Sequence, residues 1–267
     1  MRDEHDYIRE WVEHHIKNGV SHFYLYDNES VRGYEEEIGD YIKQGYITIT
    51  DWPDVNPSRL GRNNKQIDAY NHFIKSKKWS DDEWCAFIDL DEFLWPSCDL
   101  LSYLDGQPST VGGIVVVWKL FGANGHVKKQ PKLVEAYTKE TQKDIKLKQC
   151  KTISRLSQLV RMDTCHFGHT TGTYVNTFGR RVVLLKNSFI LNPTSSYVIL
   201  HHYFTKSWED WVARLKRGAV TMYAQKDRNI SLFFAMNRDM EHLREELVKD
   251  LKEEQLPSDF ESNQPQN

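Results

Sequence analysis

Apolar positions in the first half of the chain follow two alternating spacings. Stretches with an apolar residue at every third or fourth position predict helices, and short apolar runs that end in polar turns predict strands. The expected helices cover residues 6–18, 34–44 and 63–77, and the expected strands cover residues 20–26, 46–52 and 84–89. Because strand and helix alternate at this spacing, the pattern predicts a parallel sheet with helices on both faces.

The second half of the chain is less regular. Strands are expected at residues 113–118, 132–137, 181–185 and 197–201, and helices at 207–217 and 237–254. Ser207 is expected to cap the first of these helices, and Gly218 lies beyond its end.

The pattern as a whole predicts an α/β protein, with a mostly parallel central sheet flanked by helices and an irregular second half. We expect a single domain over residues 1–256, with halves of about 1–110 and about 111–256. A polar, mobile tail is expected at residues 257–267.

Composition narrows the classes of function. The 267 residues include 39% hydrophobic ones, which is typical of a globular chain, and carry a formal net charge of −3. Without a basic excess, nonspecific binding to nucleic acid is not expected. No apolar run approaches the roughly 20 residues of a membrane span, and the first residues lack a signal-peptide pattern. A cytoplasmic or otherwise soluble chain is expected, associated with membranes only through partners.

The four cysteines are Cys85, Cys98, Cys150 and Cys165, and no two of them form a C-x-x-C pair. A structural zinc site is therefore not indicated. We expect four reduced thiols, two of them buried, while a disulfide between two of them stays an open alternative.

The stretch WCAFIDLDEF, residues 84–93, carries the clearest chemical signal. It places Asp89, Asp91 and Glu92 at the carboxyl end of a strand, where open α/β sheets bind ligands. Clustered carboxylates repel one another unless a cation lies among them, and oxygen ligands suit Mg²⁺ or Mn²⁺ bridging to a diphosphate. The alternative is a solvated acidic turn in which Asp89 caps a helix. The buried strand before the turn and the apolar residues after it favour the metal site.

Several further blocks match a known family in order, and the chain resembles glycosyltransferase family 92 and its bacterial and viral relatives. Each block is modest alone, but their shared order is specific. The blocks are EWVEHH (10–15), GV (19–20) and FYLYDN (23–28); Gln66 with AY (69–70); FIDLDEF (87–93); Trp118 with FG (121–122) and GH (125–126); the segment from Lys151 to His166; and HYF (202–204), KS (206–207) and RG (217–218).

The resemblance implies a GT-A type fold and transfer of a sugar from a nucleotide donor to an acceptor hydroxyl, with inversion at the anomeric carbon. By the same analogy the expected donor is UDP-linked, such as UDP-galactose, and the acceptor is a glycan or glycoprotein. Two departures matter. In the family, a strand precedes the segment that residues 2–4 resemble, and this strand is missing here. Part of the nucleotide-binding site is therefore absent, supplied elsewhere or lost to truncation. The membrane anchor of animal and plant members is also missing from the chain.

A metal clamp would stabilise the charge that grows on a leaving diphosphate. Asp91 is the first expected ligand, and Asp89 either joins it or contacts the ribose. The resemblance points to His202 as a ligand from the far end of the chain. Adjacent strand residues face opposite sides, so only one of His201 and His202 is expected to face the ion, and we choose His202. In the simpler interpretation both histidines only close a strand.

The nucleoside is expected at the end of the strand 20–26. Asp27 is the candidate for hydrogen bonds to the base or ribose, and Arg62 and Gln66 could reach the same pocket. A turn-forming role is the alternative for Asp27. For Arg62 an ordinary position on a helix surface is the favoured interpretation.

The base that activates the acceptor is expected to be a carboxylate or a histidine. Asp163 is named by elimination, as the only carboxylate between the segment presumed to face the diphosphate and His202. A turn-capping role beside Thr164 is equally open, and His126 and His166 are the next candidates.

The acceptor and the transferred sugar are expected against Trp118, Gly122, His126 and Glu92, although core packing is the simpler role for Trp118. Lys151 and Arg155 could neutralise phosphate oxygens, but their lysine-rich surroundings favour a solvated face. Two other functions stay open: a nucleotide-sugar or carbohydrate-binding module without catalysis, and a metal-dependent phosphodiesterase.

Overall fold

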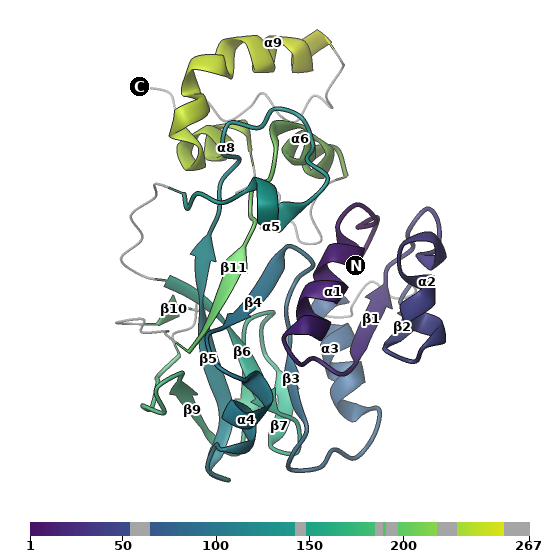
Figure 1. Cartoon of the computed structure of the whole chain (residues 1–267), viewed down its shortest axis with the longest axis vertical. Coiled ribbons are helices and arrows are strands. Elements are labelled where there is room, and N and C mark those ends of the chain that lie inside the picture. The colour runs from purple at the N-terminus through teal and green to yellow at the C-terminus, as the bar shows by residue number, and fades with distance from the viewer. Residues whose placement is uncertain (54–64, 142–147, 185–188, 191–196, 218–228, 254–267) are drawn as a thin grey trace. The chain divides into compact units, whose positions relative to one another are not determined.

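Figure 1 shows the computed structural model of the chain, which describes residues 1–53, 65–141, 148–184, 189–190, 197–217 and 229–253. The chain forms two compact units. Met1–Leu120 and Ile145–His202 make the first, here called the sheet unit, and Phe121–Asp144 and Tyr203–Asn267 make the second, the helical unit.

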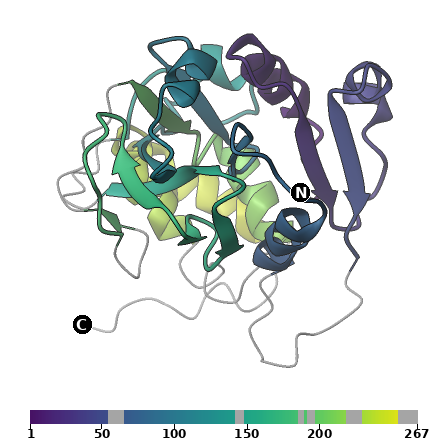
Figure 2. The ribbon, with the colours of Figure 1, turned by 90° about the horizontal axis from the view of Figure 1, so that it is seen from below.

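The predicted alternation of helix and strand is confirmed at the start of the sheet unit. The elements are α1 (Ile8–Lys17), β1 (Phe23–Asp27), α2 (Glu35–Lys43), β2 (Ile47–Asp51) and α3 (Lys65–Lys75). The first residues of the helix expected at 63–77 lie outside the described residues. Strands β1 and β2 run side by side in the same direction, with Phe23 opposite Ile47 and Asp27 opposite Asp51 (Figure 1 and Figure 2).

Seven of the described strands form one sheet, in the order β10-β6-β5-β11-β4, with β3 paired to β6 and β9 paired to β5. Its longest strand, β5, contains the apolar run GIVVVW, and Val111 to Val117 are buried throughout. The bounds are β3 (Trp84–Ala86), β4 (Glu92–Pro96), β5 (Val111–Leu120), β6 (Lys148–Arg155), β9 (Thr173–Asn176), β10 (Phe189–Ile190) and β11 (Val198–His202).

A short helix and a pair of strands complete the described part of the sheet unit. Helix α4 (Leu100–Asp105) starts at Asp99, whose carboxylate accepts a hydrogen bond from the Ser102 amide at 2.8 Å. Strands β7 (Leu159–Met162) and β8 (Gly168–Thr170) form a separate antiparallel pair.

The α/β class is confirmed, but the expectation of a mostly parallel sheet needs correction. Among the described strands, only β5/β11, β5/β9 and β1/β2 pair in parallel, while β6 pairs antiparallel with β3, β5 and β10, and β4 pairs antiparallel with β11. The strands that cause the difference are β4 and β6, which the sequence pattern does not predict. Antiparallel neighbours need no helical crossover, so the helix–strand alternation of the first half does not continue here.

Three local predictions also change. Residues 132–137, expected as a strand, contain helix α5 (Leu133–Ala136), because the buried residues Leu133 and Tyr137 are four positions apart, the spacing of a helix face. Of the strand expected at 181–185, Arg181 forms an isolated bridge with Val175, residues 182–184 are not in a strand, and residue 185 lies outside the described residues. The helix expected at 237–254 begins as the 3₁₀ helix η1 (Arg238–Leu243) and continues as α9 (Arg244–Glu253).

The described part of the helical unit contains α5, α6 (Trp208–Arg217), α8 (Ile230–Met236), η1 and α9. Its core gathers aromatic and aliphatic side chains of α6, α8 and α9, including Trp208, Trp211, Phe233, Phe234 and Leu247. The predicted cap is confirmed, since the amide of Asp210 donates to Ser207 Oγ at 3.0 Å. Gly218 and the tail at 257–267 lie outside the described residues.

Two expectations concern the chain as a whole. All four cysteines are free, with Cys150 buried, Cys98 exposed and the other two between these extremes, so one thiol rather than two is fully buried. Within the described ranges, no helix combines the length and the apolar character that a bilayer crossing requires.

Candidate functional site

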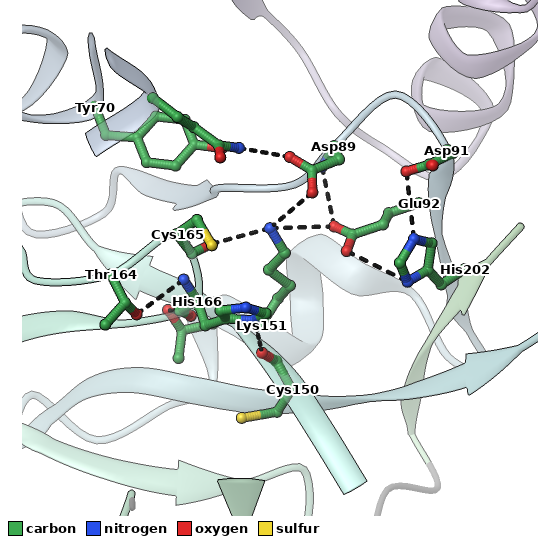
Figure 3. Close-up of polar contacts among 12 residues, drawn as sticks. Tyr70, Asp89, Asp91, Glu92, Cys150, Lys151, Thr164, Cys165, His166 and His202 are labelled. Carbon is green, nitrogen blue, oxygen red and sulfur yellow. Dashed lines mark hydrogen bonds and ion pairs between the residues drawn. The ribbon is translucent and has the colours of Figure 1, made fainter. Parts of the chain in front are cut away.

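Strand pairing brings a histidine to the acidic turn. In the antiparallel pair of β4 and β11, His202 lies opposite Glu92, and Asp91 directly precedes β4. Nε2 of His202 is 3.5 Å from Asp91 Oδ1, and Nδ1 is 3.9 Å from Glu92 Oε1 (Figure 3). His201 instead stacks against Trp95, with 4.9 Å between the ring centroids. Of the two candidate histidines, His202 is therefore the one that meets the carboxylates.

The acidic turn is held by its own backbone and by helix α1. The Glu92 amide donates to the Asp89 carbonyl at 3.0 Å, and the Asp89 amide donates to Glu92 Oε2 at 2.9 Å. From α1, Trp11 Nε1 donates to the Glu92 carbonyl at 2.8 Å, and the Leu94 amide donates to His15 Nε2 at 3.1 Å. These hydrogen bonds hold the backbone of the turn in place and thereby position its carboxylates.

The interpretation of Lys151 and Arg155 as a solvated face is wrong. Both lie in β6, which is paired to other strands on both sides, and their exposed fractions are 1% and 7%. The Arg155 guanidinium packs over the Trp84 ring and donates to the backbone carbonyls of residues 81, 107, 108 and 111. It is thus a structural clamp rather than a phosphate ligand.

The ammonium group of Lys151 contacts the carboxylates of the acidic turn. Its Nζ lies 2.9 Å from the Cys165 carbonyl, 3.3 Å from Asp89 Oδ2 and 3.5 Å from Glu92 Oε2 (Figure 3). The other carboxylate oxygen of Asp89 accepts a hydrogen bond from Gln66 Nε2 at 2.6 Å, and Gln66 also donates to the Tyr70 hydroxyl. Gln66 and Asp89, both predicted to contact the nucleotide, are therefore in direct contact with each other.

The charges in this cluster shift one another's pKa. Burial raises the pKa of Glu92 well above its usual value, and the carboxylates of Asp89 and Asp91 add to this effect against the attraction of Lys151. Burial acts against the charged form of Lys151, but Asp89 and Glu92 outweigh it and raise the pKa of the ammonium. Desolvation likewise acts to raise the pKa of Asp89, yet the attraction of Lys151 and His202 leaves it below the usual value. The cluster thus favours a charged Lys151 and a charged Asp89.

Two aromatic rings continue the site beyond His202. The Trp118 ring lies 4.4 Å from the His202 ring and 5.2 Å from the His166 ring, measured between centroids. Among the described residues, the buried Trp118 Nε1 has no hydrogen-bond partner. His166 Nδ1 donates to the Cys150 carbonyl at 2.9 Å, and burial next to Lys151 lowers the pKa of His166 to about 4. His166 is therefore a neutral imidazole near neutral pH.

The predicted nucleoside residues are partly placed. Asp27 Oδ1 accepts a hydrogen bond from Ser30 Oγ at 2.5 Å, which fits the turn-forming alternative. The backbone of Met1 pairs with β1 on either side of Asp27, since its amino group donates to the Tyr26 carbonyl and its carbonyl accepts from the Asn28 amide. Arg62 lies outside the described residues.

The other predicted residues follow strand β7 or belong to the helical unit. Asp163 follows β7 and pairs with Arg161 at 2.7 Å, with 37% of its side chain exposed. The side chain that accepts hydrogen bonds in this turn is Thr164, from the amides of residues 166 and 167. In the helical unit, a Cβ at Gly122 would lie 2.5 Å from Asn237 Oδ1, and His126 Nε2 is 3.2 Å from the Ala136 carbonyl.

The side chains at the acidic turn supply only part of the ligand shell of a divalent ion. Across the described ranges, no group of three or more His, Cys, Asp or Glu side chains is arranged to hold a metal. The 3.5 Å between Asp91 and His202 nevertheless suits two ligands of one ion, and Mg²⁺-type ions usually take only one or two protein ligands and complete their shell with water and phosphate. Glu92 Oε1 lies on the side of the far nitrogen of His202, where a carboxylate commonly orients a metal-bound imidazole, but at 3.9 Å the two atoms are not hydrogen-bonded. The residues therefore fit an ion whose remaining ligands are supplied by water or by a bound molecule.

The α/β fold, with carboxylates and a histidine meeting at one end of its strands, is consistent with a glycosyltransferase. The sequence model of glycosyltransferase family 92 matches residues 2–263. The chain belongs to glycosyltransferase family 92.

Curated relatives carry the same family name. A glycosyltransferase family 92 protein of Oryza sativa subsp. japonica is 29% identical over 134 residues, which is 48% of this chain and 21% of that protein. Others from Ricinus communis and Arabidopsis thaliana are 28% and 29% identical over 90 residues, 33% of this chain and 14% of each relative. The matched region thus spans about a fifth or less of the length of these relatives.

Proposed function

We propose that this chain transfers a glycosyl group from a nucleotide-sugar donor to a hydroxyl of an acceptor glycan, in a reaction that requires Mn²⁺ or Mg²⁺. Membership of family 92 supports glycosyl transfer. The single observation that carries the metal dependence is the meeting of His202, from β11, with Asp91, which directly precedes β4.

Asp91 and His202 would hold the ion, and the ion would neutralise charge on the leaving diphosphate when bound. Glu92 Oε1 faces the far nitrogen of His202 at 3.9 Å, and Trp11 holds the backbone of Glu92 through its indole hydrogen bond. Asp89 is 41% exposed at its side chain while its neighbours Asp91 and Glu92 are buried. It is therefore the carboxylate best placed to meet a ligand from solvent, and we assign it, with Gln66, to the nucleoside part of the donor.

The finer features of the proposal rest on the family resemblance. They are inversion at the anomeric carbon, a UDP-linked donor such as UDP-galactose, and a glycan or glycoprotein acceptor. Asp163 is kept as the proposed base. In this role its carboxylate has to release Arg161 and accept a hydrogen bond from the acceptor hydroxyl instead. The neutral His166 beside Trp118 is the second candidate for this role.

A donor panel tests the proposal. Nucleotide diphospho-sugars are incubated with the protein, with and without Mn²⁺, and release of the nucleoside diphosphate is measured in the presence of glycan acceptors. Metal-dependent release is expected for at least one donor, with a loss of at least about a hundredfold in Asp91→Asn. Asp105→Asn, which removes an exposed carboxylate from the same unit, is the matched control and is expected to keep full activity.

The two other functions give distinct results in the same panel. A binding module would be stabilised by a nucleotide sugar and show no turnover with any acceptor. A phosphodiesterase would cleave a simple phosphodiester without a sugar donor. Either result, obtained with folded protein, would contradict glycosyl transfer.

A further inference from the structure

The cation inside the acidic turn is supplied by the chain itself. Lys151 is among the largest fully buried side chains of the described residues, yet it ends in a charged group. A buried ammonium is tolerated only when anions and hydrogen-bond acceptors surround it. Here it is surrounded by one carbonyl and two carboxylates, those of Cys165, Asp89 and Glu92 (Figure 3).

These contacts divide the three carboxylates into two sets. Both oxygens of Asp89 are engaged, one by Gln66 and the other by Lys151, and Glu92 Oε2 accepts from the Asp89 amide beside the ammonium. Asp91 lies instead next to His202. A divalent ion bound by all three carboxylates would have to displace Lys151 into a buried space without compensation, which is costly.

We propose that Lys151 is a positioning residue that holds Asp89 and Glu92 with a built-in positive charge and thereby leaves the divalent ion to Asp91 and His202. This inference rests on the proposed function, because it assumes that an ion binds at that pair. Lys151 then limits the negative charge around the ion. An ion held by Asp91 and His202 alone would leave coordination positions for the diphosphate, because Asp89 and Glu92 stay with Lys151.

The test measures Mn²⁺ binding to the free protein by electron paramagnetic resonance, without any donor. In Lys151→Met the carboxylates of Asp89 and Glu92 are released and one positive charge a few ångströms away is lost. The Kd for Mn²⁺ is therefore expected to fall roughly tenfold. Lys151→Arg keeps the charge and is expected to stay close to the wild type. Lys78→Met removes an exposed lysine of the same unit and controls for net charge.

A purely structural role for Lys151 predicts the opposite sign, because a disordered turn binds Mn²⁺ more weakly. An unchanged or raised Kd in folded Lys151→Met would overturn the inference. Should Lys151→Met fail to fold, Asp89→Asn decides the question. A carboxylate that is not a ligand acts on Mn²⁺ through its charge alone, so Asp89→Asn is expected to raise the Kd by about tenfold or less and clearly less than Asp91→Asn does. A loss in Asp89→Asn as large as that in Asp91→Asn would overturn the inference.

The outcomes separate this inference from the proposed function. If the folded wild type transfers sugar and binds Mn²⁺ but the variants do not follow the expected order, only the role of Lys151 fails. If the folded wild type binds no Mn²⁺ and releases no nucleoside diphosphate from any donor, the proposed function fails, and the inference fails with it.

Discussion

Single residues show where the sequence is informative and where it is not. Asp89, Asp91 and Glu92 stand out because three carboxylates follow one apolar strand, and the structure places them around His202 and Lys151. Lys151 does not stand out, because the lysines around it are typical of a solvated face. Only the β-favouring residues that follow it, Thr152 and Ile153, mark it as part of a buried strand. Burial of a charged group depends on its distant partners, and chain spacing does not identify those.

The choice between the two adjacent histidines gives a direct prediction. His202→Asn is expected to raise the Kd for Mn²⁺ about tenfold or more, because one of two protein ligands is lost. His201→Asn is expected to leave the Kd unchanged, because the His201 ring stacks on Trp95 instead. Titration of both variants with Mn²⁺ checks this. Equal effects of the two substitutions would contradict the assignment of His202.

Buried His15 predicts a dependence of stability on pH. Burial lowers its pKa to about 3, with a further contribution from His14, whereas an unfolded histidine titrates near 6.5. Between these values the unfolded chain binds more protons than the native one. The contribution is therefore complete above pH 6.5 and is lost as the pH falls towards 3, at up to about 1.4 kcal/mol per pH unit.

Urea unfolding at several pH values measures this effect. His15→Gln cannot be protonated, so its free energy of unfolding is expected to depend less steeply on pH between 6.5 and 4. His22→Gln alters a partly exposed histidine of the same unit and is expected to keep the slope of the wild type. A wild-type slope in His15→Gln would mean that the acid sensitivity lies elsewhere.

Among the elements, those with strong periodicity were predictable and those defined by tertiary contacts were not. Helix α1 and strand β5 follow directly from their apolar patterns. Strand β4 begins inside the acidic turn at Glu92, and its polar first residue obscures the apolar strand pattern. The sequence of β6 is polar and rich in lysine, which does not predict a buried strand. Both form because a neighbouring strand supplies backbone partners, a cause that local spacing does not contain.

The cap of α6 gives a prediction about one element. Ser207→Ala removes the oxygen that accepts from the Asp210 amide, and Ser207 Oγ also donates to Asp210 Oδ2. A loss of about 1 kcal/mol in the free energy of unfolding is expected. Ser231→Ala, at an exposed serine of the same unit, is the control. A loss of less than a few tenths of a kcal/mol in Ser207→Ala would show that the helix does not depend on this cap.

At the scale of the whole molecule, the candidate metal and nucleoside residues that the structure describes all belong to the sheet unit. This unit combines two segments of the chain, Met1–Leu120 and Ile145–His202, and His202 is its last residue. The ligands therefore come from segments far apart in the sequence. This order could be anticipated from the family blocks but not from helix and strand periodicity. Gly122 and His126, expected on the acceptor side, belong to the helical unit.

Ligand binding should stabilise the sheet unit first. A nucleoside diphosphate with Mn²⁺ at a hundred times its Kd is expected to add about 2.7 kcal/mol to the free energy of unfolding. In hydrogen exchange, protection is expected in peptides that cover residues 87–95 and 198–203. Mn²⁺ alone and a nucleoside without phosphates are the controls. Protection that is confined to the helical unit would place the donor away from the acidic turn.

The hydrogen bonds from Arg155 to backbone carbonyls have a consequence for how the sheet unit unfolds in acid. The guanidinium donates to main-chain oxygens, which take up no protons in ordinary buffers. The contact between β6 and the loops before β3 and β5 is therefore equally strong in acid and in alkali. The contact between α1 and β4 through His15 is, by contrast, titratable. Gradual acidification should therefore loosen the sheet unit from its α1 side, while the end clasped by Arg155 opens last.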